Sequence, residues 1–209
     1  MAKIKNRTGE KLIQNNGLEA QVIEYRGVHD IDVKFSNGQI VKNIYYYQFK
    51  SRQIRCPMLY EPIENYIKCT NPNTGLVFII DKDDFNLIKD FYWSATDGYA
   101  CNSSKGLLHR YLMNPPKKMQ IDHINHNILD NRRSNLRICT QTENLYNQNK
   151  YKNNRSGYKG VSKHGKKWRA YINKDGKRQN IGIFSTPELA HAAYCKAAKE
   201  LHGEYAKLA

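Results

Sequence analysis

The sequence predicts an α+β chain, mostly β, made of three small domains. Three observations support this. Short apolar runs alternate with Gly-bearing turns in both flanks, one helix signal lies near the C-terminus, and the centre is rich in Asp, His and Asn. At 209 residues the chain is longer than one average domain and shorter than two large ones. We therefore expect domains over residues 1–58, 60–150 and 154–209.

The first region alternates strand-like runs with turns. The runs are Ala20–Tyr25, Ile31–Phe35 and Ile40–Val41, separated by turn residues that include Gly27 and Gly38. This pattern predicts a three-stranded meander in a small sheet or barrel, similar in size and rhythm to Src-homology or Tudor-like folds. Arg52, Arg55 and Pro57 then predict a basic linker.

The second region begins with more strand-like sequence. Runs at Leu76–Ile80 and Trp93–Ala100 flank the acidic segment Asp81–Asp84, which we expect to cap a short helix through Leu87. A Pro-containing turn at Asn114–Lys118 then leads into the polar centre. These residues predict the body of the second domain.

The charge is unevenly distributed. The net charge is +15, with ten Lys or Arg against five Asp or Glu in residues 1–60, eleven against ten in 61–150, and thirteen against four in 151–209. Such a charge favours a polyanionic partner, and we expect double-stranded DNA. The basic flanks would hold the phosphate backbone, and the nearly neutral middle would supply acidic groups for chemistry. RNA-binding, ribosome-associated and membrane-surface proteins are alternatives with similar charge.

The cysteines and the apolar runs indicate the compartment. The five cysteines are widely spaced and form no C-x-x-C pair, which is typical of reduced thiols. No apolar run approaches the ~20 residues of a membrane-spanning helix, and the N-terminus lacks the apolar core of a signal peptide. We expect a cytoplasmic protein that does not enter a membrane and has no small-molecule substrate.

The polar centre, residues 121–147, carries the candidate chemistry. Its pattern predicts a strand ending near His123, a polar loop, a return strand at Leu136–Cys139, and a helix that Thr140 and Glu143 begin as a capping box. Neighbouring residues of a regular strand face opposite sides, so Asp122 and His123 can share a site only at a bulge or a strand end. We therefore predict irregular backbone at this pair.

The order Asp122-His123, Asn135, Asn144 resembles the ββα-metal (His-Me finger) active site of HNH endonucleases, particularly phage and intron-encoded homing enzymes. The resemblance spans residues 107–149 and includes Leu108–Leu112. It implies that His123 is the general base, that Asn135 orients its ring, and that Asp122 and Asn144 hold one divalent metal.

The chemistry of these residue types agrees with those roles. An imidazole has a suitable pKa for deprotonating a water near neutral pH. A carboxylate and an amide carbonyl suit Mg²⁺, with Mn²⁺ as the alternative, and such an ion places positive charge at the crowded phosphate. A zinc site of His123, His126 and Cys139 is the competing interpretation, although cysteine pairs at zinc spacing are missing.

Other polar residues of the centre have more than one interpretation each. We interpret His126 as a solvated loop residue rather than a ligand, at a position where the family has a small residue. His109 either contacts phosphate, assists the general base, or is a packed structural histidine. Phosphate contacts or ordinary surface charges are the alternatives for Arg132, Arg133 and Arg137.

The C-terminal region predicts a three-stranded antiparallel sheet packed on one helix. Strands are expected within Gly157–Val161, Lys167–Ile172 and Gly176–Phe184. Thr186, Pro187 and Glu188 open the helix and Gly203 closes it. Alternation places Trp168, Ala170 and Ile172 inward, and we expect the helix to pack on the sheet through an apolar face of Leu189, Ala193, Tyr194, Ala197 and Leu201.

This region resembles the ethylene-response-factor (Apetala-two) DNA-binding domain, which also occurs in phage HNH endonucleases. The resemblance implies that the sheet enters the major groove and reads base edges. Nine Lys or Arg against one Asp between Arg155 and Arg178 favour this over a merely solvated sheet. The expected DNA-binding residues are Lys159, Ser162, His164, Lys166, Arg169, Tyr171, Asn173, Arg178 and Asn180.

The sequence thus predicts a metal-dependent HNH endonuclease that hydrolyses phosphodiester bonds at a recognised DNA site. The resemblance implies a homing-type enzyme of a phage or mobile element, which we expect to be a monomer. A catalytically silent DNA-binding regulator is the alternative, and an RNA-binding basic protein is the third.

Overall fold

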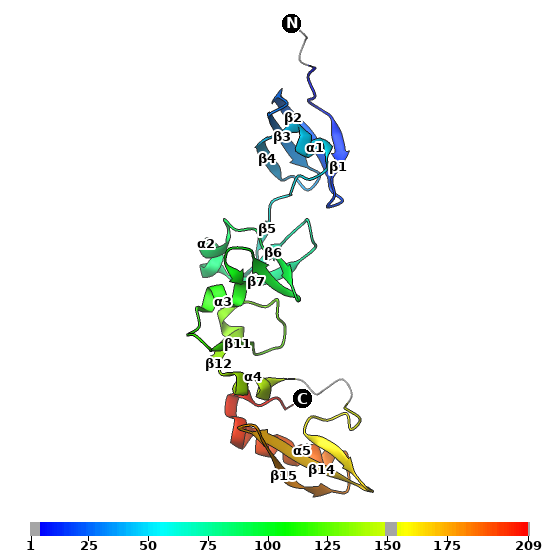
Figure 1. Cartoon of the computed structure of the whole chain (residues 1–209), viewed down its shortest axis with the longest axis vertical. Helices are drawn as coiled ribbons and strands as arrows, with labels where there is room; N and C mark the ends of the chain where they lie inside the picture. The colour runs from blue at the N-terminus through cyan, green and yellow to red at the C-terminus, as the bar shows by residue number, and fades with distance from the viewer. Residues whose placement is uncertain (1–4, 149–153, 209) are drawn as a thin grey trace. The chain divides into compact units, whose positions relative to one another are not determined.

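A computed structural model describes residues 5–148 and 154–208 (Figure 1). The chain divides into two compact units, Met1–Leu112 with Asn127–Asn135, and Met113–His126 with Leu136–Ala209. The expected boundary between the second and third domains, near residues 150–154, falls mostly outside the described residues. The division into three domains stays a prediction.

The first unit begins with a four-stranded antiparallel sheet in the order β1-β2-β3-β4. Its strands are Lys11–Ile13, Glu19–Gly27, Asp30–Phe35 and Ile40–Ile44, and the short helix α1 follows at Tyr46–Lys50. The predicted meander is confirmed as β2 to β4, whereas β1 was not predicted. Ile54 and Cys56 join the buried core of this sheet, so part of the expected basic linker is packed rather than solvated.

The same unit continues with two three-stranded sheets and short helices. One sheet has the order β5-β6-β7 and the other β10-β9-β8. Trp93 is fully buried in their shared apolar core. The elements are β5 Leu59–Pro62, β6 Tyr66–Thr70, β7 Val77–Asp81, η1 Lys82–Asp84, α2 Phe85–Ile88, β8 Ser94–Thr96, β9 Tyr99–Asn102, β10 Gly106–Leu107 and α3 Leu108–Met113.

The strand-like run expected at Trp93–Ala100 is confirmed as β structure, but it is divided into two strands, β8 and β9. The structure has a hairpin there, because Asp97 and Gly98 take φ angles of 52° and 83° and form a tight turn between β8 and β9. Asp-Gly is a strong signal for such a turn, since both central residues need positive φ. The predicted short helix is confirmed as η1 followed by α2, but neither Asp81 nor Asp84 caps it with a side-chain hydrogen bond.

The loop Asn127–Asn135 belongs to the first unit. Ile79 of β7 forms a parallel bridge with Asp130, and its backbone bonds Leu129 and Asn131 at 2.9 Å each. The 3-10 turn η2, Arg133–Asn135, ends this loop. The central polar segment is therefore anchored to β7 before the chain enters its second strand.

The second unit contains a two-stranded hairpin and a helix. Strands β11, Gln120–His123, and β12, Leu136–Cys139, are antiparallel, and α4, Gln141–Asn147, follows directly. Thr140 and Glu143 form the predicted capping box, with Glu143 N donating to Thr140 Oγ1 and Thr140 N donating to Glu143 Oε2. The predicted strand–strand–helix order is confirmed.

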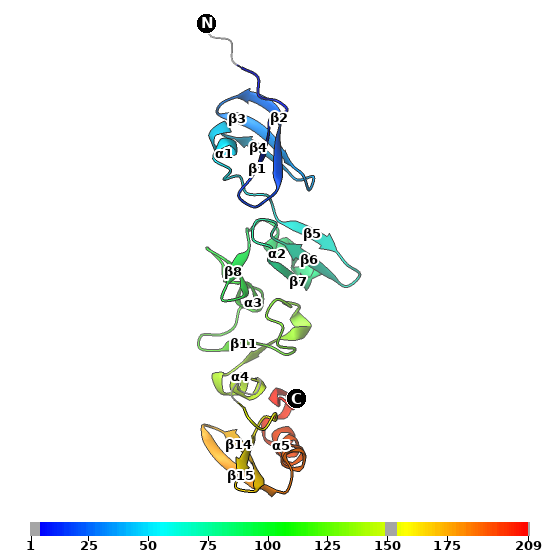
Figure 2. The ribbon, with the colours of Figure 1, turned by 90° about the vertical axis from the view of Figure 1, so that its right-hand side faces the viewer.

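The C-terminal part of this unit is a sheet of order β13-β14-β15 with one long helix beside it (Figure 2). The strands are Val161–His164, Lys167–Lys174 and Lys177–Phe184, and α5, Pro187–His202, contacts all three before η3, Gly203–Tyr205. Thr186 caps α5, Pro187 is in its first turn and Gly203 ends it, as predicted.

The apolar face predicted for α5 is confirmed in part, since Tyr194 is buried and Ala197 and Leu201 pack against the core, whereas Leu189 does not. The buried residues are Ala190, Tyr194, Ala198 and His202, whereas Leu189 is 53% exposed. Small alanines let the helix backbone approach the sheet closely, which a leucine at that position would prevent. Gly160 is part of the same close packing, because a Cβ there would lie 2.1 Å from the Tyr194 ring.

None of the described helices combines the length and apolar character needed to cross a bilayer.

Candidate active site and DNA-binding face

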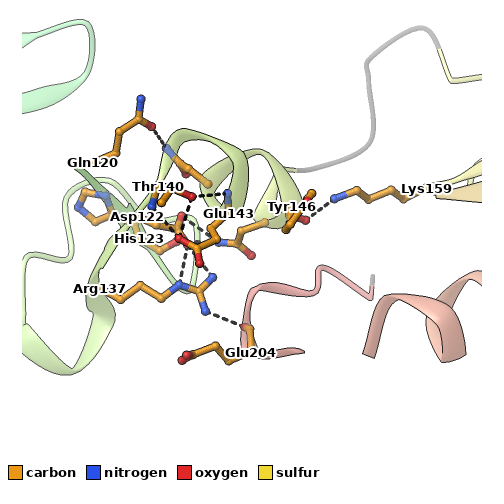
Figure 3. A network of polar contacts seen from close by, with 11 residues as sticks. Gln120, Asp122, His123, Arg137, Thr140, Glu143, Tyr146, Lys159 and Glu204 are labelled. Atoms are coloured by element: carbon orange, nitrogen blue, oxygen red, sulfur yellow. Dashed lines mark hydrogen bonds and ion pairs between the residues drawn. The ribbon is translucent and has the colours of Figure 1, made fainter. Parts of the chain in front are cut away.

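Asp122 and His123 are the last two residues of β11. Both are buried, and they pair in regular register with Arg137 and Leu136. The predicted irregular backbone is therefore wrong, and of the two alternatives, a bulge or a strand end, the strand end is the one observed. Figure 3 shows the His123 ring directed away from the Asp122–Arg137 pair, as alternation along a strand requires.

The Asp122 carboxylate is held by two side chains. Arg137 donates from Nε and Nη2 to Oδ2 at 2.9 and 2.6 Å (Figure 3). Asn147, near the C-terminus of α4, donates from Nδ2 to Oδ1 at 3.0 Å and Oδ2 at 2.9 Å. The same amide lies 3.4 Å from the His123 carbonyl oxygen. Carboxylate, amide and carbonyl groups thus converge at the end of β11.

Asn144 does not join this group. Its Nδ2 donates to Gln120 Oε1 at 2.7 Å, two residues before Asp122 on the same face of β11. Asn144 and Asn147 are three residues apart and share one face of α4, which packs along the strand. The expectation that Asn144 lies beside Asp122 is therefore replaced by Asn147. The sequence offered a signal for this, since both asparagines stand at helical spacing.

This donor set fits a hard divalent cation. Mg²⁺ and Mn²⁺ prefer carboxylate, amide and carbonyl oxygens. A half-turn of the Asn147 amide would exchange Nδ2 for Oδ1 and present three oxygens, from Asp122, Asn147 and the His123 backbone. In the described part of the chain, no three His, Cys, Asp or Glu side chains gather as a metal cluster. Burial also raises the pKa of Cys139 to about 11, which disfavours the thiolate that zinc requires.

His126 is a residue whose environment the sequence did not predict. It has a φ of 64°, its side chain is half-buried, and its Nε2 is buried without a hydrogen-bond partner. It is therefore not a solvated loop residue. Its φ explains why a small residue suits this position, since only Gly, Asn, Asp and His adopt it readily. Burial lowers the pKa of His126.

His109 and Asn135 belong to the first unit and are both buried. The His109 ring packs edge-on against Tyr99, with centroids 5.2 Å apart, which favours the packed alternative over a phosphate contact. Asn135 donates from Nδ2 to the Asp130 carbonyl at 2.8 Å, and it directly precedes Leu136. Its role toward His123 remains a prediction.

The central arginines form ion pairs with buried aspartates. Arg132 bonds Asp130 at 2.7–2.8 Å, and Arg133 bonds Asp84 at 2.7–3.2 Å. Arg137 bonds Asp122, as described above. These pairs anchor the loop and the hairpin and give each guanidinium a carboxylate partner, while the alternatives of phosphate contact and surface charge stay predictions.

The outward face of the C-terminal sheet gathers most of the expected DNA-binding side chains. Cross-strand neighbours are Ser162 with Arg169, Tyr171 with Asn180, and Asn173 with Arg178. The Arg178 guanidinium lies 4.3 Å from the Tyr171 ring centre, and Arg169 Nη2 lies 2.7 Å from His164 Nδ1. Lys166 is exposed in the turn between β13 and β14. These residues form one polar, basic surface.

Lys159 is not part of that surface. Its Nζ donates to the carbonyl oxygens of Tyr146 and Gln148 at 2.6 Å each, at the C-terminal end of α4 (Figure 3). Burial lowers the pKa of this amine to about 8. A cation at a helix C-terminus satisfies carbonyl groups that lack helical partners. Lys159 therefore ties the C-terminal sheet to α4, contrary to the expected DNA contact.

Known proteins resemble this chain in the region of the hairpin and beyond. The family model described as HNH endonuclease matches residues 113–146. An uncharacterized HNH endonuclease of Acanthamoeba polyphaga mimivirus is 28% identical over 150 residues, covering 68% of this chain and 79% of the relative. Protein 3.8 of Escherichia phage T7 is 36% identical over 94 residues, covering 44% of this chain and 77% of the relative. No solved structure matches. The chain belongs to the HNH endonuclease family and is a DNA endonuclease.

Proposed function

We propose that this endonuclease hydrolyses double-stranded DNA with one divalent metal, Mg²⁺ or Mn²⁺, at a site recognised by its C-terminal sheet. The observation that carries the proposal is the Asp122 carboxylate, within 3.0 Å of the Asn147 amide and at the end of the strand that carries His123. Asp122 and Asn147 would hold the cation, with the His123 carbonyl oxygen nearby. Bound there, the cation would supply positive charge beside the scissile phosphate and the departing 3′ oxygen.

His123 would act as the general base. A phosphate lying over the end of β11 can be approached from both faces of the strand, so the imidazole and the Asp122 carboxylate can act on opposite sides of it. His123 would accept a proton from the attacking water, and Asn135 would fix the orientation of the ring. The reaction would proceed by inversion at phosphorus.

The C-terminal sheet would supply target recognition. Exposed Lys166 and Arg178 would contact phosphates, while Tyr171, Asn173 and Asn180 would face base edges in the major groove. This arrangement of phosphate-contacting and base-contacting side chains on one sheet resembles that of Apetala-two DNA-binding domains. Relatives from a phage and a giant virus support a homing-type or mobile-element role.

The test is cleavage of a large mixed phage or genomic DNA in Mg²⁺ or Mn²⁺, resolved on native and denaturing gels. We expect discrete products that depend on metal. His123→Ala should lower the cleavage rate by roughly 10²–10⁴-fold while DNA binding in EDTA is retained. Cutting by His123→Ala at the wild-type rate would show that the base is another residue.

Two further variants identify the helix ligand. Asn147→Ala should reduce cleavage and weaken Mn²⁺ binding, whereas Asn144→Ala, its neighbour on the same face of α4, should mainly lose the bond to Gln120. If Asn144→Ala weakens Mn²⁺ binding and cleavage more than Asn147→Ala does, Asn144 is the metal ligand.

A further inference from the structure

Arg137 bridges the candidate metal ligand and the C-terminal end of α5. It stands opposite Asp122 in the hairpin, and its side chain is only 11% exposed. Two of its N–H groups bond Oδ2 of Asp122, while the Asn147 amide donates to both oxygens and is the side chain that bonds Oδ1. The guanidinium therefore fixes the carboxylate through one oxygen and leaves the other directed toward the amide.

The opposite side of the guanidinium is held by η3. Arg137 Nη1 donates to the Glu204 carbonyl oxygen at 2.6 Å (Figure 3). The guanidinium carbon lies 4.2 Å from the Tyr205 ring centre. Cation–π contacts gain strength when they are desolvated. Each nitrogen of this guanidinium thus bonds either Asp122 or the Glu204 carbonyl oxygen.

The C-terminal module, which is the sheet β13–β15 with α5 and η3, also contacts α4. Tyr146 of α4 stacks on His202, the last residue of α5, with ring centroids 3.6 Å apart. His202 Nε2 lies 2.8 Å from the Asn173 carbonyl oxygen of β14, and Lys159 binds the end of α4. The hairpin, α4 and the C-terminal sheet are consequently joined through several independent contacts.

We propose that Arg137 is a positioning residue through which η3 sets the orientation of the Asp122 carboxylate and so couples the C-terminal module to cation binding. The inference rests on the proposed function, in which Asp122 is a metal ligand. Side chains that orient a metal ligand commonly change metal affinity when they are lost. A planar guanidinium bonding one carboxylate oxygen with two N–H groups is well suited to this, because it restricts the carboxylate plane.

The experiment measures Mn²⁺ binding to the full chain by electron paramagnetic resonance, without DNA. Tyr205→Ala should weaken Mn²⁺ binding by about 3–10-fold, and Arg137→Ala by roughly 10–100-fold. Tyr205→Phe is the matched control, since it keeps the ring face, and should bind Mn²⁺ as the wild type does. Cleavage by Tyr205→Ala should recover at saturating Mn²⁺, and its DNA affinity in EDTA should not change.

The possible failures are distinguishable. If Asp122→Ala binds Mn²⁺ normally, the metal site of the proposed function is wrong. If Asp122→Ala loses Mn²⁺ binding but Tyr205→Ala and Arg137→Lys both bind it as the wild type does, the coupling through Arg137 is wrong. Tyr205→Phe behaving like Tyr205→Ala would also overturn it. Thermal melting, monitored by circular dichroism, verifies that each variant is folded. If Arg137→Ala does not fold, Arg137→Lys takes its place.

Discussion

Replacing Lys159 by methionine separates two roles for this residue, a phosphate contact and a clamp on α4. Methionine keeps the apolar stem of the side chain and removes the amine. In the structure the amine bonds two carbonyl oxygens at the end of α4 at 2.6 Å. The clamp role predicts a loss of stability, whereas a phosphate contact predicts a loss of salt-dependent DNA affinity.

The size of the stability loss in Lys159→Met follows from two opposing contributions, the hydrogen bonds of the amine and the cost of burying it. Hydrogen bonds from a charged donor contribute about 1.5–3 kcal/mol each. Burial lowers the pKa of Lys159 from 10.5 to about 8, which corresponds to roughly 3 kcal/mol of desolvation at neutral pH. The net destabilisation by Lys159→Met is the difference between these terms, about 0–3 kcal/mol. Between pH 8 and 10.5 the folded wild type binds fewer protons than the unfolded chain, so its stability rises with pH there, and the variant lacks this gain.

Thermal melting and DNA affinity at several salt concentrations measure both effects. The melting temperature of the second unit should fall by about 4–8 °C for each kcal/mol lost. The slope of log affinity against log salt should equal that of the wild type. Lys166→Met is the matched control, because this exposed lysine is expected to contact phosphate and its loss should reduce the slope by about 0.9. Wild-type melting together with a reduced slope for Lys159→Met would refute the clamp.

Three further predictions concern stability and reactivity. Gly160→Ala should destabilise the C-terminal module by about 2–4 kcal/mol in urea unfolding, because a Cβ would meet Tyr194 at 2.1 Å and the backbone has positive φ. Gly165→Ala, with positive φ but open space, should cost only about 1 kcal/mol, and equal losses would contradict the packing argument. Burial lowers the pKa of His202, so the free energy of unfolding should fall as the pH drops below 6.5. This fall should be smaller in His202→Phe, and identical profiles of unfolding free energy against pH would argue against the reasoning. Burial raises the pKa of Cys69 to about 12, so its thiol should resist iodoacetamide at pH 8 until the protein unfolds, which mass spectrometry can follow.

Local signals in the sequence were sufficient to predict several elements. Thr140 with Glu143, and Thr186 with Pro187, mark helix starts through bonds that depend only on neighbouring residues. Strand β12 was predicted with its observed bounds because its apolar residues follow a polar loop. Asp97-Gly98 was an equally local turn signal, and the longer apolar run around it concealed the hairpin.

Contacts between distant segments could not be predicted in the same way. The choice between Asn144 and Asn147 depends on how far α4 is shifted along β11, which helical spacing alone does not define. The exposure of Leu189 depends on how closely α5 approaches the sheet. Lys159 is one cation among many in a basic region, and only the folded chain brings it to the end of α4.

The buried aspartates around the polar centre explain why Asp122 is the metal candidate. Both oxygens of Asp84 accept from Arg133, and both oxygens of Asp130 accept from Arg132. Arg137 engages only Oδ2 of Asp122, and Oδ1 faces an amide that can rotate. The first two carboxylates are neutralised by structural ion pairs, so replacing either by asparagine should lower stability by removing the buried charge that holds a partly exposed arginine in place. Asp122→Asn should instead weaken Mn²⁺ binding and cleavage more than it lowers the melting temperature, because Asp122 has an oxygen that no guanidinium occupies.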